Sequence, residues 1–68
     1  MTEREFKHLL NLLNQTNAST ERYVQLACEY LGIDENHMKP YSQIEQTLRR
    51  YGVYGIGYHE IAVTMDRE

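Results

Sequence analysis

The chain has 68 residues, of which 41% are hydrophobic, and its ten acidic and seven basic side chains give a formal net charge of −3. That apolar fraction is too high for an intrinsically disordered chain, and the even spread of charge disfavours unspecific binding to nucleic acid or to an anionic membrane. We therefore expect residues 1–68 to form a single small helical domain. No apolar run reaches membrane-spanning length and the first residues do not resemble an export signal, so we expect a cytoplasmic protein.

The first predicted helix begins at Thr2. Thr2 and Glu5 have the spacing of a capping box, in which the threonine hydroxyl accepts from a helical N–H and the glutamate accepts from the threonine's own N–H. An apolar stripe at helical spacing follows, formed by Phe6, Leu9, Leu10 and Leu13. Leu12 lies off this stripe and indicates a second contact surface. The Asn-, Ser- and Thr-rich residues 14–20 then favour a turn.

The second predicted helix, Ser19 to Leu31, is apolar around more than half of its circumference. The apolar arc is formed by Tyr23, Val24, Leu26, Ala27, Cys28, Tyr30 and Leu31. A surface helix needs an apolar stripe only a little wider than about 100°, so we expect this helix to lie in the centre, between neighbours on two sides. Gly32 is predicted to be its left-handed C-terminal cap. The position of Cys28 on the arc favours a buried core residue over a reactive thiol.

Part of this segment resembles the helix-turn-helix of DNA-binding proteins. A small residue, Cys28, precedes Gly32 by four positions, an aliphatic and a polar residue follow, and Met38 has a later core position. The resemblance implies that the next helix enters the major groove of DNA. Pro40 departs from the pattern because it falls inside that helix, where it would remove a backbone donor.

A third, shorter helix is predicted after Pro40, because Ser42 and Glu45 have the spacing of a second capping box. Its apolar face would carry Ile44, Leu48 and Tyr51, and it would end at Gly52. Arg49 and Arg50 fall in its last turn, where positive charge stabilises the helix dipole.

The C-terminal part differs in composition, with Gly52, Gly55 and Gly57 close together. Ile61, Val63 and Met65 alternate with a two-residue period, which predicts one apolar face of a β-strand. We expect an antiparallel hairpin that turns near Gly55–Gly57 and packs on the helices. A terminal helix through Ile61 and Met65 is the alternative. The expected fold is therefore mainly α, a three-helix domain with a short C-terminal β-hairpin or strand.

The candidate chemistry is sparse. His8, His37 and His59 do not have the spacing of a zinc site, and no nucleophile is paired with a general base. The glycines of the tail lack the lysine and the strand–helix context of a phosphate-binding loop. We expect no metal, no cofactor and no enzymatic activity.

The tyrosines suggest a protein contact instead. Tyrosine offers a large contact area at low entropic cost, and glycines beside it let another backbone approach closely. The predicted partner-binding residues are Tyr51, Tyr54, Ile56, Tyr58, Ile61 and Val63. Ile61 and Val63 would extend a partner's sheet by edge pairing. A basic, aromatic platform for nucleic acid, formed by Arg49 and Arg50 with these tyrosines, is the alternative use of the same residues.

The function that these features favour is a small non-enzymatic regulator or inhibitor that binds a protein partner and blocks it sterically. Its size and lack of catalytic groups are typical of phage or mobile-element proteins. A homodimer is expected, because so short a chain rarely builds enough core by itself. The alternative function is a dimeric helix-turn-helix-like DNA-binding regulator.

Overall fold

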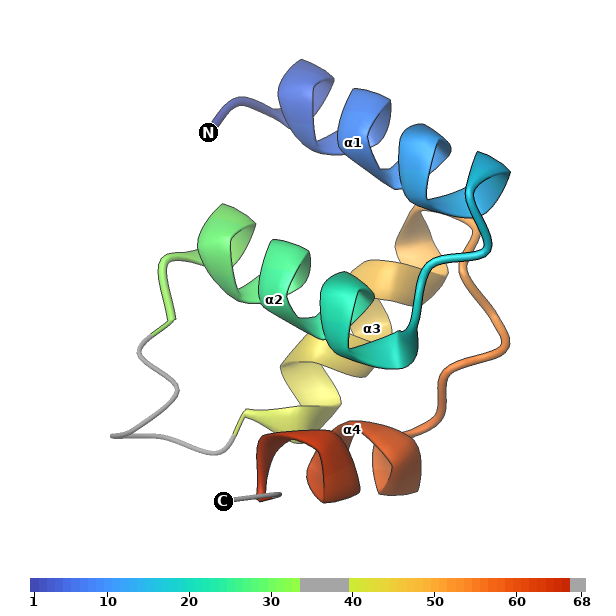
Figure 1. Ribbon diagram of the computed structural model, residues 1–68. Coiled ribbons are helices and arrows are strands. Elements are labelled where there is room, and N and C mark those ends of the chain that lie inside the picture. The colour runs from blue at the N-terminus through green and yellow to red at the C-terminus, as the bar shows by residue number, and fades with distance from the viewer. Residues whose placement is uncertain (34–39, 67–68) are drawn as a thin grey trace.

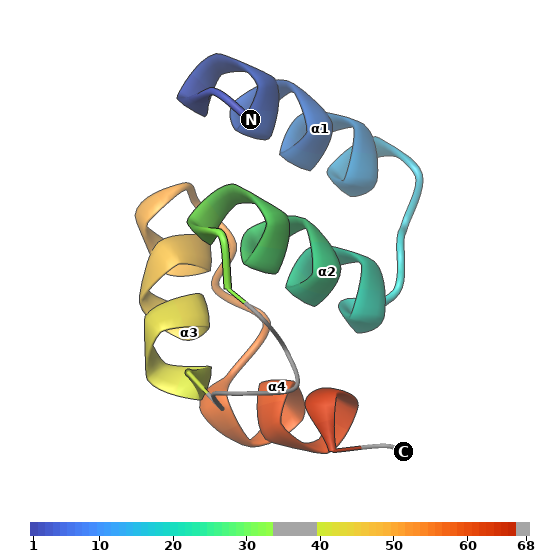
Figure 2. The same ribbon diagram turned by 90° about the vertical axis from the view of Figure 1, so that its left-hand side faces the viewer.

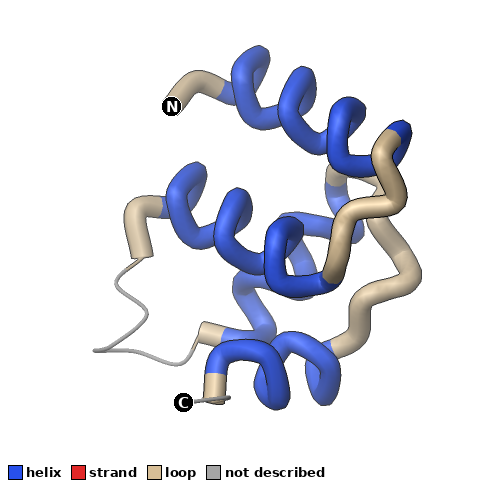
Figure 3. Tube along the Cα trace, in the orientation of Figure 1, coloured by secondary structure: helices blue, strands red, loops and turns tan. Residues whose placement is uncertain are grey.

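The computed structural model describes residues 1–33 and 40–66, and this part of the chain folds into four helices (Figure 1). In chain order they are α1 (Glu3–Gln15), α2 (Thr20–Leu31), α3 (Tyr41–Arg50) and α4 (Tyr58–Met65). Figure 3 shows helices and loops and no strand within the described residues. The mainly helical class is confirmed, whereas the C-terminal hairpin is wrong.

Helix α1 begins as predicted from the sequence. The Thr2 hydroxyl accepts from the Glu5 N–H at 3.1 Å, and the Glu5 side chain accepts from the Thr2 N–H at 3.5 Å, so both halves of the capping box are present. The helix buries Phe6 and Leu10 against the rest of the molecule. Beyond its end, Asn17 adopts a positive φ of 52°, a conformation that asparagine tolerates better than most residues.

Helix α2 is the central helix, and it packs against all three others (Figure 2). Its buried residues are Val24, Leu26, Ala27 and Cys28. The prediction that its wide apolar arc needs several neighbours is therefore confirmed. Gly32 caps the C-terminus with a φ of 70°, and the Ile33 N–H donates to the Cys28 carbonyl at 3.0 Å. The helix-turn-helix resemblance extends into residues 34–39, which lie outside the described part of the chain.

Helix α3 begins two residues earlier than the predicted capping box allows, because its N-cap is Pro40 and not Ser42. Pro40 makes no side-chain cap hydrogen bond, so the second capping box is wrong. The predicted end at Gly52 is confirmed. Gly52 has a φ of 93°, and the Val53 N–H donates to the Leu48 carbonyl at 2.8 Å in the manner of a Schellman motif.

Helix α4 replaces the expected hairpin. Ile61 is fully buried, whereas Val63 is 52% exposed, so these residues point to different sides of a helix instead of sharing one face of a strand. Tyr58, Ile61 and Met65 also have helical spacing, and the terminal helix named as the alternative is the observed structure. A helix satisfies its backbone hydrogen bonds internally, whereas an isolated two-stranded hairpin is marginal in water.

All four helices contribute to one core, and the loop between α3 and α4 adds to it. The buried residues are Phe6, Leu10, Val24, Leu26, Ala27, Cys28, Tyr41, Ile44, Leu48, Val53, Ile56 and Ile61. None of the buried core residues in the described chain is charged.

Candidate functional site

The six predicted partner-binding residues divide into two groups in the structure. Ile56 and Ile61 belong to the core, and Tyr51 is half-buried. Tyr54, Tyr58 and Val63 are exposed, so these three offer the largest accessible area to a partner without a rearrangement. Edge pairing through Ile61 and Val63 is wrong for this fold, because both residues are helical.

Tyr54 is the most exposed large hydrophobic side chain of the described residues, at 74%. It lies in the loop that joins α3 to α4, between two residues that are buried in the core, Val53 and Ile56. The Val53 N–H is also bonded to the end of α3, as described above. The loop backbone is therefore anchored on both sides of Tyr54, and this short segment leaves the tyrosine ring in solvent.

Tyr58 lies at the end of the same loop, at the first position of α4, and α3 holds it in place. Its backbone N–H donates to Oε2 of Glu45 at 2.9 Å, so Glu45 satisfies one of the free N–H groups at the start of α4. The Tyr58 ring packs edge-on against Tyr41, with the ring centroids 5.4 Å apart. The Tyr41 hydroxyl in turn donates to the carboxylate of Asp66 at 2.8 Å. We call Tyr54 and Tyr58 together the tyrosine surface.

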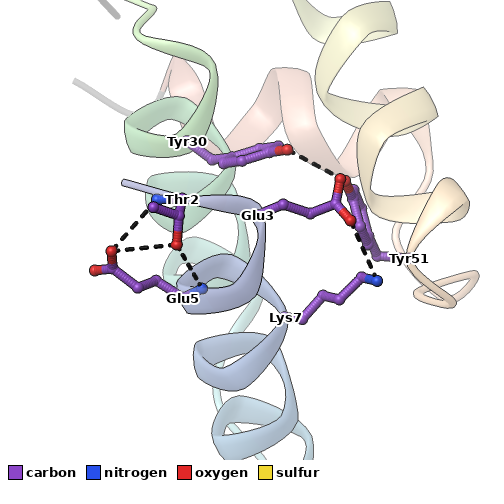
Figure 4. A network of polar contacts seen from close by, with 6 residues as sticks. All are labelled: Thr2, Glu3, Glu5, Lys7, Tyr30 and Tyr51. Atoms are coloured by element: carbon purple, nitrogen blue, oxygen red, sulfur yellow. Dashed lines mark hydrogen bonds and ion pairs between the residues drawn. The ribbon is translucent and has the colours of Figure 1, made fainter.

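Tyr51 belongs to a different set of contacts, an aromatic cluster that joins α1, α2 and α3. Phe6 stacks on Tyr30, with centroids 4.2 Å apart and planes 7° from parallel, and meets Tyr51 edge-on at 5.0 Å. The Tyr30 and Tyr51 hydroxyls are 3.2 Å apart (Figure 4). The ammonium of Lys7, which is paired with Glu3 at 3.3 Å, lies 5.8 Å from the centroid of the Tyr51 ring.

This cluster changes the acidity of Tyr51. The hydrogen bond with Tyr30, then burial, and then the nearby negative charge of Glu3 raise the pKa of Tyr51 from 10.0 to about 12. The neutral hydroxyl is therefore the stable form of Tyr51 far above neutral pH. Its contacts give Tyr51 a role in holding three helices together.

A second surface was indicated in the sequence only by Leu12. It is an apolar groove between α1 and α2, with a volume of about 440 Å³. Its lining residues are Leu9, Leu12, Leu13, Thr16, Arg22, Gln25, Leu26 and Glu29. Leu9 and Leu12 are 37% and 42% exposed, although both are large aliphatic residues. We call this surface the leucine groove. The sequence does not reveal the extent of this groove, because its pattern assigns Leu9 to the buried stripe of the first helix and Leu26 to the buried arc of the second.

Of the residues considered from the sequence for a basic, aromatic platform, the structure brings Arg50 and Tyr51 to the same groove. This groove lies between α1 and α3, and Lys7 and His8 also line it. Arg49 lies 3.7 Å from Oε2 of Glu45. Within residues 1–33 and 40–66, no three His, Cys, Asp or Glu side chains are grouped in a way that could hold a metal ion. His37 lies outside the described residues.

Comparison with protein-family models, with curated proteins and with solved structures gives no match to this chain. Among the described helices, none is long and apolar enough to cross a lipid bilayer.

Proposed function

We propose that this protein is a non-catalytic regulator that binds a protein partner through the tyrosine surface and blocks the partner sterically. The exposure of Tyr54 on an anchored loop is the observation that supports this function best. A tyrosine that is already held in a binding position loses little conformational entropy when a partner covers it. Burial of such an aromatic anchor commonly contributes about 2 kcal/mol or more to binding.

The surroundings of Tyr58 add a second anchor to the same surface. Glu45 and Tyr41 hold the start of α4, so a partner that covers Tyr58 does not have to order it first. Val63 is exposed on the same helix but lies five positions after Tyr58, which places the two side chains on different sides of α4. The proposed contact site is therefore narrowed from the six predicted residues to Tyr54 and Tyr58.

A photoreactive phenylalanine analogue at position 54 tests this function. The analogue is aromatic and replaces an exposed ring, so the fold should tolerate it. In cells of the native host, illumination should join position 54 to one protein, whereas the same analogue at the exposed Gln15 on α1 should not capture that protein. The affinity of the purified chain for the captured protein should fall at least about tenfold in Tyr54→Ala, with an unchanged far-UV circular dichroism spectrum. Equal capture from positions 54 and 15, or unchanged partner binding by Tyr54→Ala and Tyr58→Ala, would reject the site.

A dimeric DNA-binding regulator is the competing function, and it predicts different behaviour. Its recognition helix would begin soon after Gly32, in residues 34–39, which lie outside the described part of the chain. Duplex binding at two salt concentrations separates the two functions, because contacts to phosphates make affinity fall steeply with salt. Retardation of a DNA duplex that is lost at higher salt would favour the DNA-binding regulator over the proposed one.

A further inference from the structure

We propose that the leucine groove is the face through which two copies of this chain associate, around a twofold axis that crosses α1 and α2. This interface is separate from the tyrosine surface and goes beyond the proposed function. The groove leaves Leu9 and Leu12 exposed beside the buried Leu26, and a contiguous exposed apolar surface on a small protein commonly marks a contact with another molecule. The arrangement of the groove indicates which molecule that is.

The two helices of the groove present matching stripes. On α1 the lining residues are Leu9, Leu12, Leu13 and Thr16, and on α2 they are Arg22, Gln25, Leu26 and Glu29. Both sets have the spacing i, i+3, i+4 and i+7, which places each set on one side of its helix. The helices lie side by side and antiparallel (Figures 1 and 2). The groove is thus as long on one helix as on the other, about 10 Å for seven residues.

A twofold axis that lies in the interface, perpendicular to the helices, places each helix antiparallel to its own copy. With the axis at the middle of each stripe, Leu12 of one copy lies over Leu13 of the other, and Gln25 over Leu26. The result is a four-helix arrangement in which two helix pairs pack face to face. Amphipathic helices commonly bury their apolar faces in this way.

The charges at the ends of the groove are complementary under the same operation. Arg22 and Glu29 stand seven residues apart on α2 with opposite charges, and the twofold axis brings Arg22 of each copy to Glu29 of the other. Neither side chain has an ion-pair partner within residues 1–33 and 40–66. The α1 stripe carries no charge that would oppose this pairing. Self-complementary charge around an exposed apolar strip favours a second copy over a foreign helix, because a foreign helix would have to supply the same charges in the opposite order.

Sedimentation equilibrium of the full chain over a range of concentrations tests the interface. The wild type should form a dimer at concentrations up to hundreds of micromolar. Leu12→Glu should be a monomer over the same range, because it places a charge in the apolar strip, and its far-UV spectrum should be unchanged since Leu12 is outside the core. Val63→Glu is the matched control, because Val63 is also an exposed aliphatic residue on a helix but lies outside the groove, and this variant should dimerise like the wild type.

Charge reversal tests the twofold arrangement itself. Arg22→Glu and Glu29→Arg each replace two attractions by two repulsions, so each variant alone should dimerise about tenfold more weakly. A mixture of the two variants restores opposite charges at both ends and should form a heterodimer, and the double variant should dimerise like the wild type. A wild-type monomer at hundreds of micromolar, or a dimer that Leu12→Glu leaves intact, would overturn the proposal. A mixture that associates no better than the single variants would overturn the twofold pairing.

Discussion

Replacement of Phe6 by leucine should destabilise the protein by removing aromatic pairing while a large apolar side chain stays in the core. Phe6 is fully buried and makes two ring contacts, a stacked one with Tyr30 at 4.2 Å and an edge-on one with Tyr51 at 5.0 Å. Each such pair contributes about 0.5–1.5 kcal/mol beyond the area that it buries, so Phe6→Leu should lower the free energy of unfolding by about 1–3 kcal/mol. A domain of this size rarely exceeds about 3–5 kcal/mol in total.

Urea unfolding followed by far-UV circular dichroism measures this loss, at one fixed protein concentration because association also stabilises the fold. A double-mutant cycle with Tyr30→Leu separates the stacking energy from packing, and the coupling should be about 0.5–1.5 kcal/mol. Helix α1 is held mainly by its packing on α2 and by the contact of Phe6 with Tyr51, so its amides should exchange with solvent first in Phe6→Leu. A loss below about 0.5 kcal/mol, or a coupling near zero, would refute the role given to the aromatic cluster.

The remaining predictions concern α4 and Tyr51. Ile61→Ala should lower the free energy of unfolding by about 2–5 kcal/mol, because it leaves a cavity at a fully buried position. Val63→Ala should change the free energy of unfolding by less than about 0.5 kcal/mol, because Val63 is exposed. Equal losses in the two variants would contradict the helical structure of this segment. Tyr51 has its pKa raised to about 12, so the folded chain keeps this proton longer than the unfolded chain, and its contribution to stability is complete below pH 10.0. The free energy of unfolding, measured with urea, should therefore fall as pH rises from 10.0 to about 12, and it should fall less in Tyr51→Phe. An identical pH dependence in the wild type and the variant would refute the raised pKa of Tyr51.

The candidate site was only partly predictable from the sequence. The exposure of Tyr54 and Tyr58 fits the expected recognition surface, since tyrosines beside glycines are typical of contact sites. Ile56 could not be assigned from the sequence around it, because the loop turns it into the core between the exposed Tyr54 and Tyr58. The leucine groove needs two helices to form it, so no single stretch of sequence displays it.

Local sequence alone determined the start of α1 and the ends of α2 and α3. The Thr2–Glu5 capping box and the stops at Gly32 and Gly52 depend on contacts within a few residues, and all three are observed. The wide apolar arc likewise placed α2 in the centre, because its apolar surface could be buried only between several neighbours.

Tertiary structure decided the rest. The tail has both two-residue and helical spacing, and packing selected the helix by burying Ile61 and leaving Val63 in water. Glu45 was expected to cap its own helix, yet it binds the N–H of Tyr58, thirteen residues away. The structure of the tail and the partner of Glu45 depend on which surfaces meet in the folded chain. The local conformational energies of helix and strand are too similar to select one of them from the sequence of the segment alone.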